Sequence, residues 1–149
     1  MAHHAWKTIG ALVIIVALSA GVAFSAGERK AIAVAKANIR MGPGTNYEVL
    51  WQAERYYPVV VVKKEGKWRK FKDFEGDEGW IFASLLSDTR AVVVKKERCN
   101  IRSGPGTDHA IKFVAGKGVP FKVLKKSGNW LNVKHSDGDT GWIYHSLVW

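Results

Sequence analysis

An internal duplication constrains this chain more than any other feature. Shifted by 62 residues, the sequence aligns with itself without a gap, and 22 of the 50 positions from 38 to 87 are identical to their partners at 100 to 149. Because no gap is needed, every turn has the same length in both copies, so one supersecondary unit is written twice. The chain of 149 residues is therefore expected to form two small domains rather than one large catalytic fold.

Short strands and tight turns account for each copy. The runs Val59–Lys63 and Val92–Val94 are rich in β-branched residues, which favours strands over helices. Single helical turns are expected at Ala83–Leu86 and at His145–Val148, and no segment has a sustained helical period. Gly-containing hairpin turns are predicted at 65–66, 75–76, 127–128 and 137–138. The fold class is therefore all-β, with a small barrel of about five strands in each copy.

Three repeated motifs resemble those of the bacterial SH3-like (SH3b) domain. They are Asn-Ile-Arg-x-Gly-Pro-Gly-Thr at 38–45 and 100–107, Gly-x-Trp at 66–68 and 128–130, and Gly-Trp-Ile at 79–81 and 141–143. The resemblance covers about residues 31–149 and implies two small SH3-like β-barrels in tandem, at 31–88 and 91–149. It also implies an exported bacterial protein that binds cell-wall peptides or other protein partners and has no catalytic residues of its own.

The N-terminal segment has the pattern of a secretory signal peptide. Lys7 precedes an uncharged stretch from 8 to 27 with the apolar run IGALVIIVALSA, and small residues follow this run. Residues 1–26 are therefore predicted to be a hydrophobic signal segment, with an uncleaved membrane anchor as the alternative. The rest of the chain is expected in the periplasm or at the cell surface, and a membrane is a partner only if the segment stays uncleaved.

Positive charge is concentrated in the second copy. The chain has a net charge of +10, of which residues 27–89 contribute +2 and residues 90–149 contribute +7. An exported protein rarely meets nucleic acid, so no nucleic-acid partner is expected despite this charge. The anionic partners available outside the cytoplasm are peptidoglycan carboxylates, envelope phosphates and acidic proteins. A basic surface that only aids solubility is the alternative.

Reactive side chains are not shared between the copies. Cys99 stands where the first copy has Ala37, and it is expected to be a small buried hydrophobic residue. His109, His135 and His145 likewise have no histidine partner in the first copy, so a nucleophile with its base is not expected. The sequence predicts no enzyme activity, no cofactor and no metal. Calcium at the acidic turn 73–78 is a less favoured alternative to a solvated loop.

Aromatic and basic residues alternate with core residues along the predicted strands. Leu131 and Val133 mark the core side of their strand, so Trp130 is expected on the outer face. Aromatic rings beside lysines suit a peptide or sugar chain. The alternative is that these rings cover the barrel ends or pack between the domains. The candidate ligand-binding residues are Tyr47, Trp68, Lys70, Trp80, Phe82, His109, Trp130, Lys134, Trp142 and Tyr144.

These observations together indicate a non-catalytic exported binding module. The favoured ligand is peptidoglycan or a cell-wall peptide. The alternative is an envelope protein that the tandem domains hold as an adaptor or scaffold, and a small cell-wall hydrolase is the least favoured reading. Only about three residues, 87–89, separate Leu86 from the next predicted strand, so limited independent motion of the domains is expected.

Overall fold

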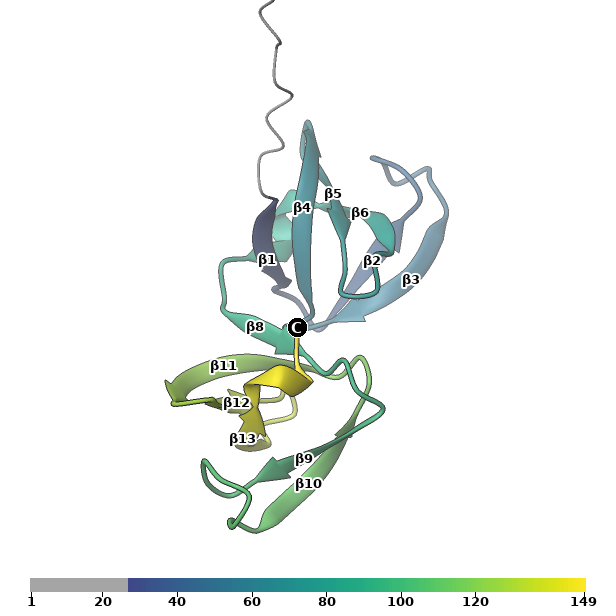
Figure 1. The fold of residues 1–149 in the computed structure, drawn as a ribbon. Coiled ribbons are helices and arrows are strands. Elements are labelled where there is room, and N and C mark those ends of the chain that lie inside the picture. Colours follow the sequence, from purple (N-terminus) through teal and green to yellow (C-terminus); the bar gives the residue numbers. More distant parts are fainter. Residues whose placement is uncertain (1–26) are drawn as a thin grey trace, which may run out of the picture.

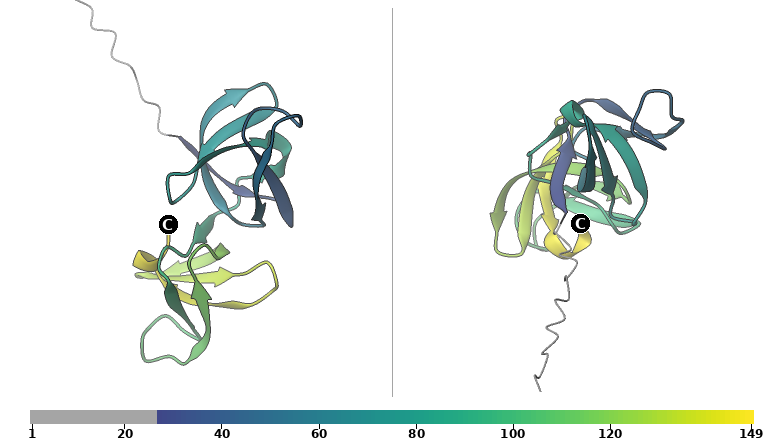
Figure 2. Two further views of the ribbon diagram at one scale, coloured as in Figure 1. Left: turned by 90° about the vertical axis from the view of Figure 1, so that its right-hand side faces the viewer. Right: turned by 90° about the horizontal axis from the view of Figure 1, so that it is seen from above.

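Two β-barrels lie end to end in the computed structural model, which describes residues 27–149 (Figure 1). The predicted signal segment at 1–26 lies outside the described residues. The barrels correspond to the two copies of the repeat, and the C-terminus lies at the junction between them (Figure 2). All sheet pairs are antiparallel, which confirms the all-β tandem fold.

The first barrel is a seven-stranded sheet in the order β3-β2-β6-β5-β4-β1-β7. Its elements are β1 (Glu28–Ile32), β2 (Lys36–Arg40), β3 (Val49–Glu54), β4 (Pro58–Glu65), β5 (Trp68–Lys72), β6 (Glu78–Phe82), the 3₁₀ turn η1 (Ala83–Leu85) and β7 (Leu86–Ser87). The second barrel is a six-stranded sheet in the order β10-β9-β13-β12-β11-β8. Its elements are β8 (Ala91–Val93), β9 (Arg98–Arg102), β10 (Ile111–Gly116), β11 (Pro120–Ser127), β12 (Trp130–Lys134), β13 (Thr140–Tyr144) and the 3₁₀ turn η2 (His145–Leu147).

The predicted turns fall between the expected strands, two of them shifted by one residue. The turns that join β4 to β5 and β11 to β12 occupy 66–67 and 128–129, because Glu65 and Ser127 still belong to their strands. Those predicted at 75–76 and 137–138 lie between β5 and β6 and between β12 and β13. Each barrel has more strands than the five expected, because the short segments β1, β7 and β8 also pair with the sheets. The helical segments of residues 27–149 are two 3₁₀ turns of three residues, far too short to cross a membrane.

Alternation along the strands builds a separate core in each barrel. The first core contains Ile39, Phe71 and Ile81, and all three are at most 1% exposed. Their partners at +62, Ile101, Val133 and Ile143, are fully buried in the second core. The prediction that Leu131 and Val133 face the core is therefore confirmed, and Trp130 lies on the opposite, outer side of β12.

The two barrels also share packing at their junction. Val93 of β8 is fully buried in the core cluster of the first barrel, and the indole of Trp149 packs against that cluster. Arg29 Nη2 donates a hydrogen bond of 3.1 Å to the carbonyl of Ala91, and the Arg29 guanidinium lies 4.2 Å from the centroid of the Trp149 ring. His135 Nε2 is 3.8 Å from Glu54 Oε1 across the same junction. These contacts support the expectation of limited independent motion.

Candidate functional site

Each barrel has a cavity of about 610 Å³ on its outer surface, and the two cavities are built from the same positions of the repeat. The cavity of the first barrel is lined by Lys36, Ala37, Asn38, Arg40, Gly44, Thr45, Asn46, Trp68, Phe82 and Leu85. The cavity of the second barrel is lined by Arg98, Cys99, Asn100, Arg102, Gly106, Thr107, Asp108, Trp130, Tyr144 and Leu147. Every residue of the second set lies 62 positions after a residue of the first, so we call them the equivalent cavities.

A pair of aromatic rings forms one wall of each cavity. Trp68 of β5 lies opposite Phe82 of β6, and their ring centroids are 5.5 Å apart at an interplanar angle of 72°. Trp130 and Tyr144 form the same edge-to-face pair at 5.4 Å and 67°. All four rings are partly exposed, so each wall offers an aromatic surface to a ligand.

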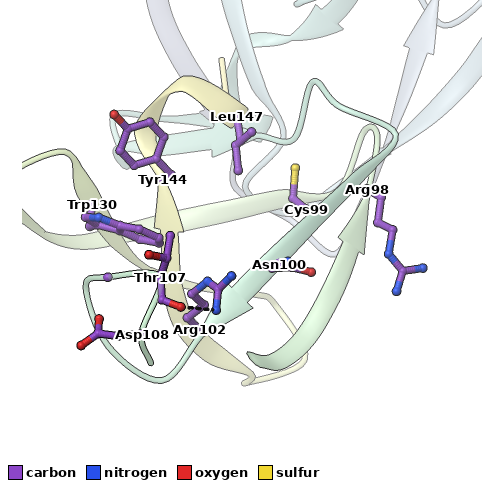
Figure 3. A pocket seen from close by; sticks show the side chains of 10 residues that line it. Arg98, Cys99, Asn100, Arg102, Thr107, Asp108, Trp130, Tyr144 and Leu147 are labelled. Atoms are coloured by element: carbon purple, nitrogen blue, oxygen red, sulfur yellow. Dashed lines mark hydrogen bonds between the residues drawn. The ribbon is translucent and has the colours of Figure 1, made fainter. Parts of the chain in front are cut away.

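The Gly-Pro-Gly loop forms the facing wall, and an arginine present in both copies holds it in place. Arg102 Nη1 donates hydrogen bonds to the carbonyls of Thr107 at 3.0 Å and His109 at 2.9 Å. Figure 3 shows the first of these bonds below the Trp130 ring, with Asp108 at the rim of the cavity. Arg40 makes the same two bonds to the carbonyls of Thr45 and Tyr47, at 3.1 and 2.9 Å.

A glycine in this loop makes room for the ring that follows it. A Cβ atom on Gly42 would lie 2.4 Å from the ring of Tyr47, and one on Gly104 would lie 2.5 Å from the ring of His109. No side chain can approach so closely, so the glycine at this position allows the ring to pack on the loop. Tyr47 and His109 therefore brace the loop and do not line either cavity.

The equivalent cavities differ in residue type at four positions, one of which keeps its positive charge. Lys36, Asn46 and Phe82 of the first cavity correspond to Arg98, Asp108 and Tyr144 of the second. Tyr144 adds a hydroxyl group to the aromatic wall, and Asp108 adds a carboxylate at the rim. Ala37 corresponds to Cys99, whose side chain is only 1% exposed. The second cavity therefore offers more hydrogen-bonding groups than the first.

The structure brings four of the predicted binding residues into the cavities. Trp68, Phe82, Trp130 and Tyr144 line them, whereas Trp80 and Trp142 lie further along the same outer face. Trp80 is only 8% exposed, with Lys63 Nζ 6.0 Å from its ring centroid, and Lys125 Nζ lies 5.5 Å from the ring of Trp142.

The two predicted lysines lie on that same outer face. Lys70 is paired with Glu78 at 3.0 Å, and Lys134 is exposed on β12. Neither lysine lines a cavity.

The sequence reasoning missed the floor of the cavities. Asn38 and Arg40 lie in β2, and their partners Asn100 and Arg102 lie in β9. In the sequence these residues belong to the motif shared with the bacterial SH3-like domain, and their identity in both copies is the signal that could single them out. The arginine was missed because its role depends on backbone carbonyls five and seven residues further along the chain.

Cys99 is buried, and the acidic turn at 73–78 is held by hydrogen bonds to its own backbone. Burial raises the pKa of the Cys99 thiol, and Figure 3 shows its sulfur pointing to the opposite side of β9 from Asn100. Asp73 Oδ1 accepts hydrogen bonds from the backbone N–H groups of Glu75 and Asp77, both at 3.0 Å. Within residues 27–149, no group of three or more His, Cys, Asp or Glu side chains could hold a metal ion.

The fold and the paired cavities define a class of small all-β binding modules that occur in tandem. A sequence model described as the bacterial SH3 domain matches residues 33–88 and 95–149, so the chain belongs to the bacterial SH3 domain family. Domains of this family act at the cell envelope, where they generally bind peptidoglycan.

Three proteins similar to this chain are longer than it is, and the chain spans only part of each. A putative N-acetylmuramoyl-L-alanine amidase, YrvJ of Bacillus subtilis (strain 168), is 30% identical over 67 residues, which are 45% of this chain and 13% of the amidase. An NlpC/P60 family protein from Bacillus cereus ATCC 10987 is 16% identical with a TM-score of 0.40, over 82% of this chain and 56% of that one. NlpC2 from Trichomonas vaginalis is 13% identical with a TM-score of 0.37, over 85% of this chain and 48% of that one.

Proposed function

We propose that this chain binds peptidoglycan at the cell envelope through the two equivalent cavities. The observation that carries the proposal is that all ten lining positions of one cavity recur in the other at the same spacing. Structural residues of a barrel recur in a duplication as well, but a partly exposed aromatic pair facing a braced loop is a surface that packing alone does not require. Membership of the bacterial SH3 domain family supports the same ligand.

The chemistry of the cavities suits a peptide or a sugar chain. The aromatic pair offers apolar surface for a sugar ring or a peptide methyl group. The amides of Asn38 and Asn100 can donate and accept hydrogen bonds, and Lys36 and Arg98 add positive charge at the rim. Stem peptides of peptidoglycan carry amides and carboxylates, so these groups match them.

We propose further that binding is not accompanied by catalysis. The only thiol is 1% exposed, and its raised pKa keeps it protonated and unreactive near neutral pH. The alternative function is that of an envelope adaptor, whose partner is another protein. Incubation with purified muropeptides tests catalysis, and the expected result is no product.

Sedimentation with isolated peptidoglycan sacculi tests the ligand. The full chain is compared with a Trp68→Ala/Trp130→Ala double variant and with a Val62→Ala/Leu124→Ala control. The control positions are also 62 apart and exposed, but they lie outside both cavities. We expect the tryptophan variant to bind about tenfold more weakly, because buried aromatic side chains dominate such contacts, and the control to bind normally. Circular dichroism establishes that both variants are folded.

Salt and single variants sharpen the result. Two cavities acting together are supported if binding meets two conditions. It persists at moderate salt, and each single tryptophan variant reduces it less than the double variant does. Loss of binding at moderate salt for every form would mean that charge alone is responsible. An absence of binding by the unaltered chain would contradict the proposal and favour a protein partner.

A further inference from the structure

Four lysines gather on the outer face of the second barrel, away from both cavities. Lys122 of β11 lies directly opposite Lys134 of β12, and Lys134 lies opposite Thr140 of β13. Lys125 lies opposite Asn132, and its Nζ is 5.5 Å from the ring of Trp142. Lys112 of β10 reaches the same face, since its Nζ donates a hydrogen bond to the carbonyl of Thr140. We call Lys112, Lys122, Lys125 and Lys134 the lysine face.

The first barrel partly offsets the charge of the equivalent face with one carboxylate. Glu78 occupies the position of Thr140, and its carboxylate lies 3.0 Å from Lys70 Nζ and 3.5 Å from Lys72 Nζ. These two ammonium groups, Lys70 foremost, hold the pKa of Glu78 below its usual value, so the carboxylate stays charged. Two further positions of the face are apolar there, Leu50 and Val60 in place of Lys112 and Lys122. The first face therefore carries three lysines and one carboxylate, Lys63, Lys70, Lys72 and Glu78, whereas the second carries four lysines and no carboxylate.

The imbalance has an electrostatic cost. Among residues 27–149, no carboxylate lies within 4.0 Å of the ammonium group of any of the four lysines. Like charges directly opposite each other on neighbouring strands, as in the Lys122–Lys134 pair, destabilise a sheet. A folded chain that keeps such a pair without a counter-charge gains from an anion supplied by a ligand.

We propose that the lysine face binds a linear polyanion, at a site separate from the two cavities. Neighbouring strands are about 4.8 Å apart and alternate residues about 7 Å apart, so the ammonium groups form a row at spacings that successive charges of a polymer can match. Lysine acts as a point charge on a flexible stem, which suits phosphate groups without requiring a fixed geometry. A membrane-binding face combines basic residues with apolar side chains that insert, but Trp142 at its centre is only partly exposed.

Binding of sodium polyphosphate to the full chain, measured over a range of salt concentrations, tests this proposal. The decisive variant is Thr140→Glu, which places beside Lys134 the carboxylate that the first barrel has at Glu78. A glutamate side chain fits at the equivalent position of the first barrel, where Glu78 stands. We expect the affinity of this variant for polyphosphate to fall about fivefold or more. The negative slope of log affinity against log salt should become shallower by about one. The matched control is Lys67→Gln, which changes the net charge equally at an exposed turn of the first barrel, and it should lose less than twofold.

A reciprocal variant and a vesicle arm complete the experiment. Glu78→Thr releases Lys70 and Lys72 in the first barrel, and we expect it to increase polyphosphate binding. Equal losses in Thr140→Glu and Lys67→Gln would mean that only net charge matters, and they would overturn the proposal. Binding to phosphatidylglycerol vesicles without binding to polyphosphate would overturn it in favour of a membrane surface. Sacculus binding by Thr140→Glu should stay normal, so this test and that of the cavities can fail separately.

Discussion

Asp73 organises the turn between β5 and β6 through both of its carboxylate oxygens. Oδ1 accepts the backbone N–H groups of Glu75 and Asp77, and Oδ2 accepts the hydroxyl of Tyr57 at 3.0 Å. In the second barrel His135 replaces Asp73, and its Nδ1 accepts the N–H of Asp137 at 3.3 Å. The same turn is thus held by two different acceptors. Burial, followed by the charge of Asp73, raises the pKa of Tyr57 well above its usual value.

This buried phenol makes the first barrel sensitive to alkaline pH. Because the folded state keeps the Tyr57 proton above the pH at which the unfolded chain releases it, the contribution of Tyr57 to stability is complete below about pH 10 and declines as the pH rises further. We expect denaturant unfolding to show a steeper loss of stability from pH 9 to pH 11 in the unaltered chain than in Tyr57→Phe. At pH 8, Tyr57→Phe should itself cost about 1–2 kcal/mol. Parallel pH dependence in the two proteins would contradict this assignment.

At the scale of the element, the loops 41–48 and 103–110 show what the sequence pattern could and could not predict. Gly, Pro and hydrophobic alternation placed the turns and strands correctly, because these signals act over a few residues. The arginine that braces each loop was not anticipated, since its hydrogen bonds link a strand to carbonyls on the far side of the turn. The same limit applies to the cavity, whose aromatic wall and loop wall meet only in the folded barrel.

Removing the brace should loosen the loop without unfolding the barrel. We expect Arg102→Met to increase hydrogen exchange of the amides in 103–110 by about tenfold or more, while the unfolding free energy falls by only about 1 kcal/mol. Arg98→Met is the matched control, because Arg98 lines the same cavity but makes no hydrogen bond to the loop among residues 27–149. Unchanged exchange in Arg102→Met would show that the loop holds its shape by itself.

At the scale of the whole molecule, the second repeat completes the core of the first. Val93 belongs to β8 of the second barrel yet is fully buried in the first core, and Trp149 packs on that core beside Arg29. Backbone hydrogen bonds join Val93 and Trp149 in both directions, at 3.0 and 2.9 Å. The orientation of the two cavities is therefore tied to the stability of the first barrel.

Loss of the Trp149 indole should both weaken and loosen the pair of barrels. We expect Trp149→Ala to lower the unfolding free energy of the first barrel by about 2 kcal/mol, because a partly buried indole is removed from its core. Small-angle scattering should then give a larger maximum dimension than for the unaltered chain. Trp68→Ala removes a partly exposed indole that is away from the junction, so it should leave the scattering unchanged. Identical scattering for Trp149→Ala would mean that the junction does not depend on this ring.

The sequence alone determined the duplication, the all-β class, the turns and the inner and outer faces of the strands, because each of these depends on local composition and on periodicity of two. Only the tertiary structure decided that Trp68 and Phe82 share a cavity with Arg40, that the ring of Tyr47 packs on Gly42, and that Glu78 pairs with Lys70 and Lys72 on a face where Thr140 provides no carboxylate. Each of these features depends on how particular side chains meet in the folded barrel, either across paired strands or across a turn. Their contacts are set by strand register and barrel closure, which composition and spacing do not encode.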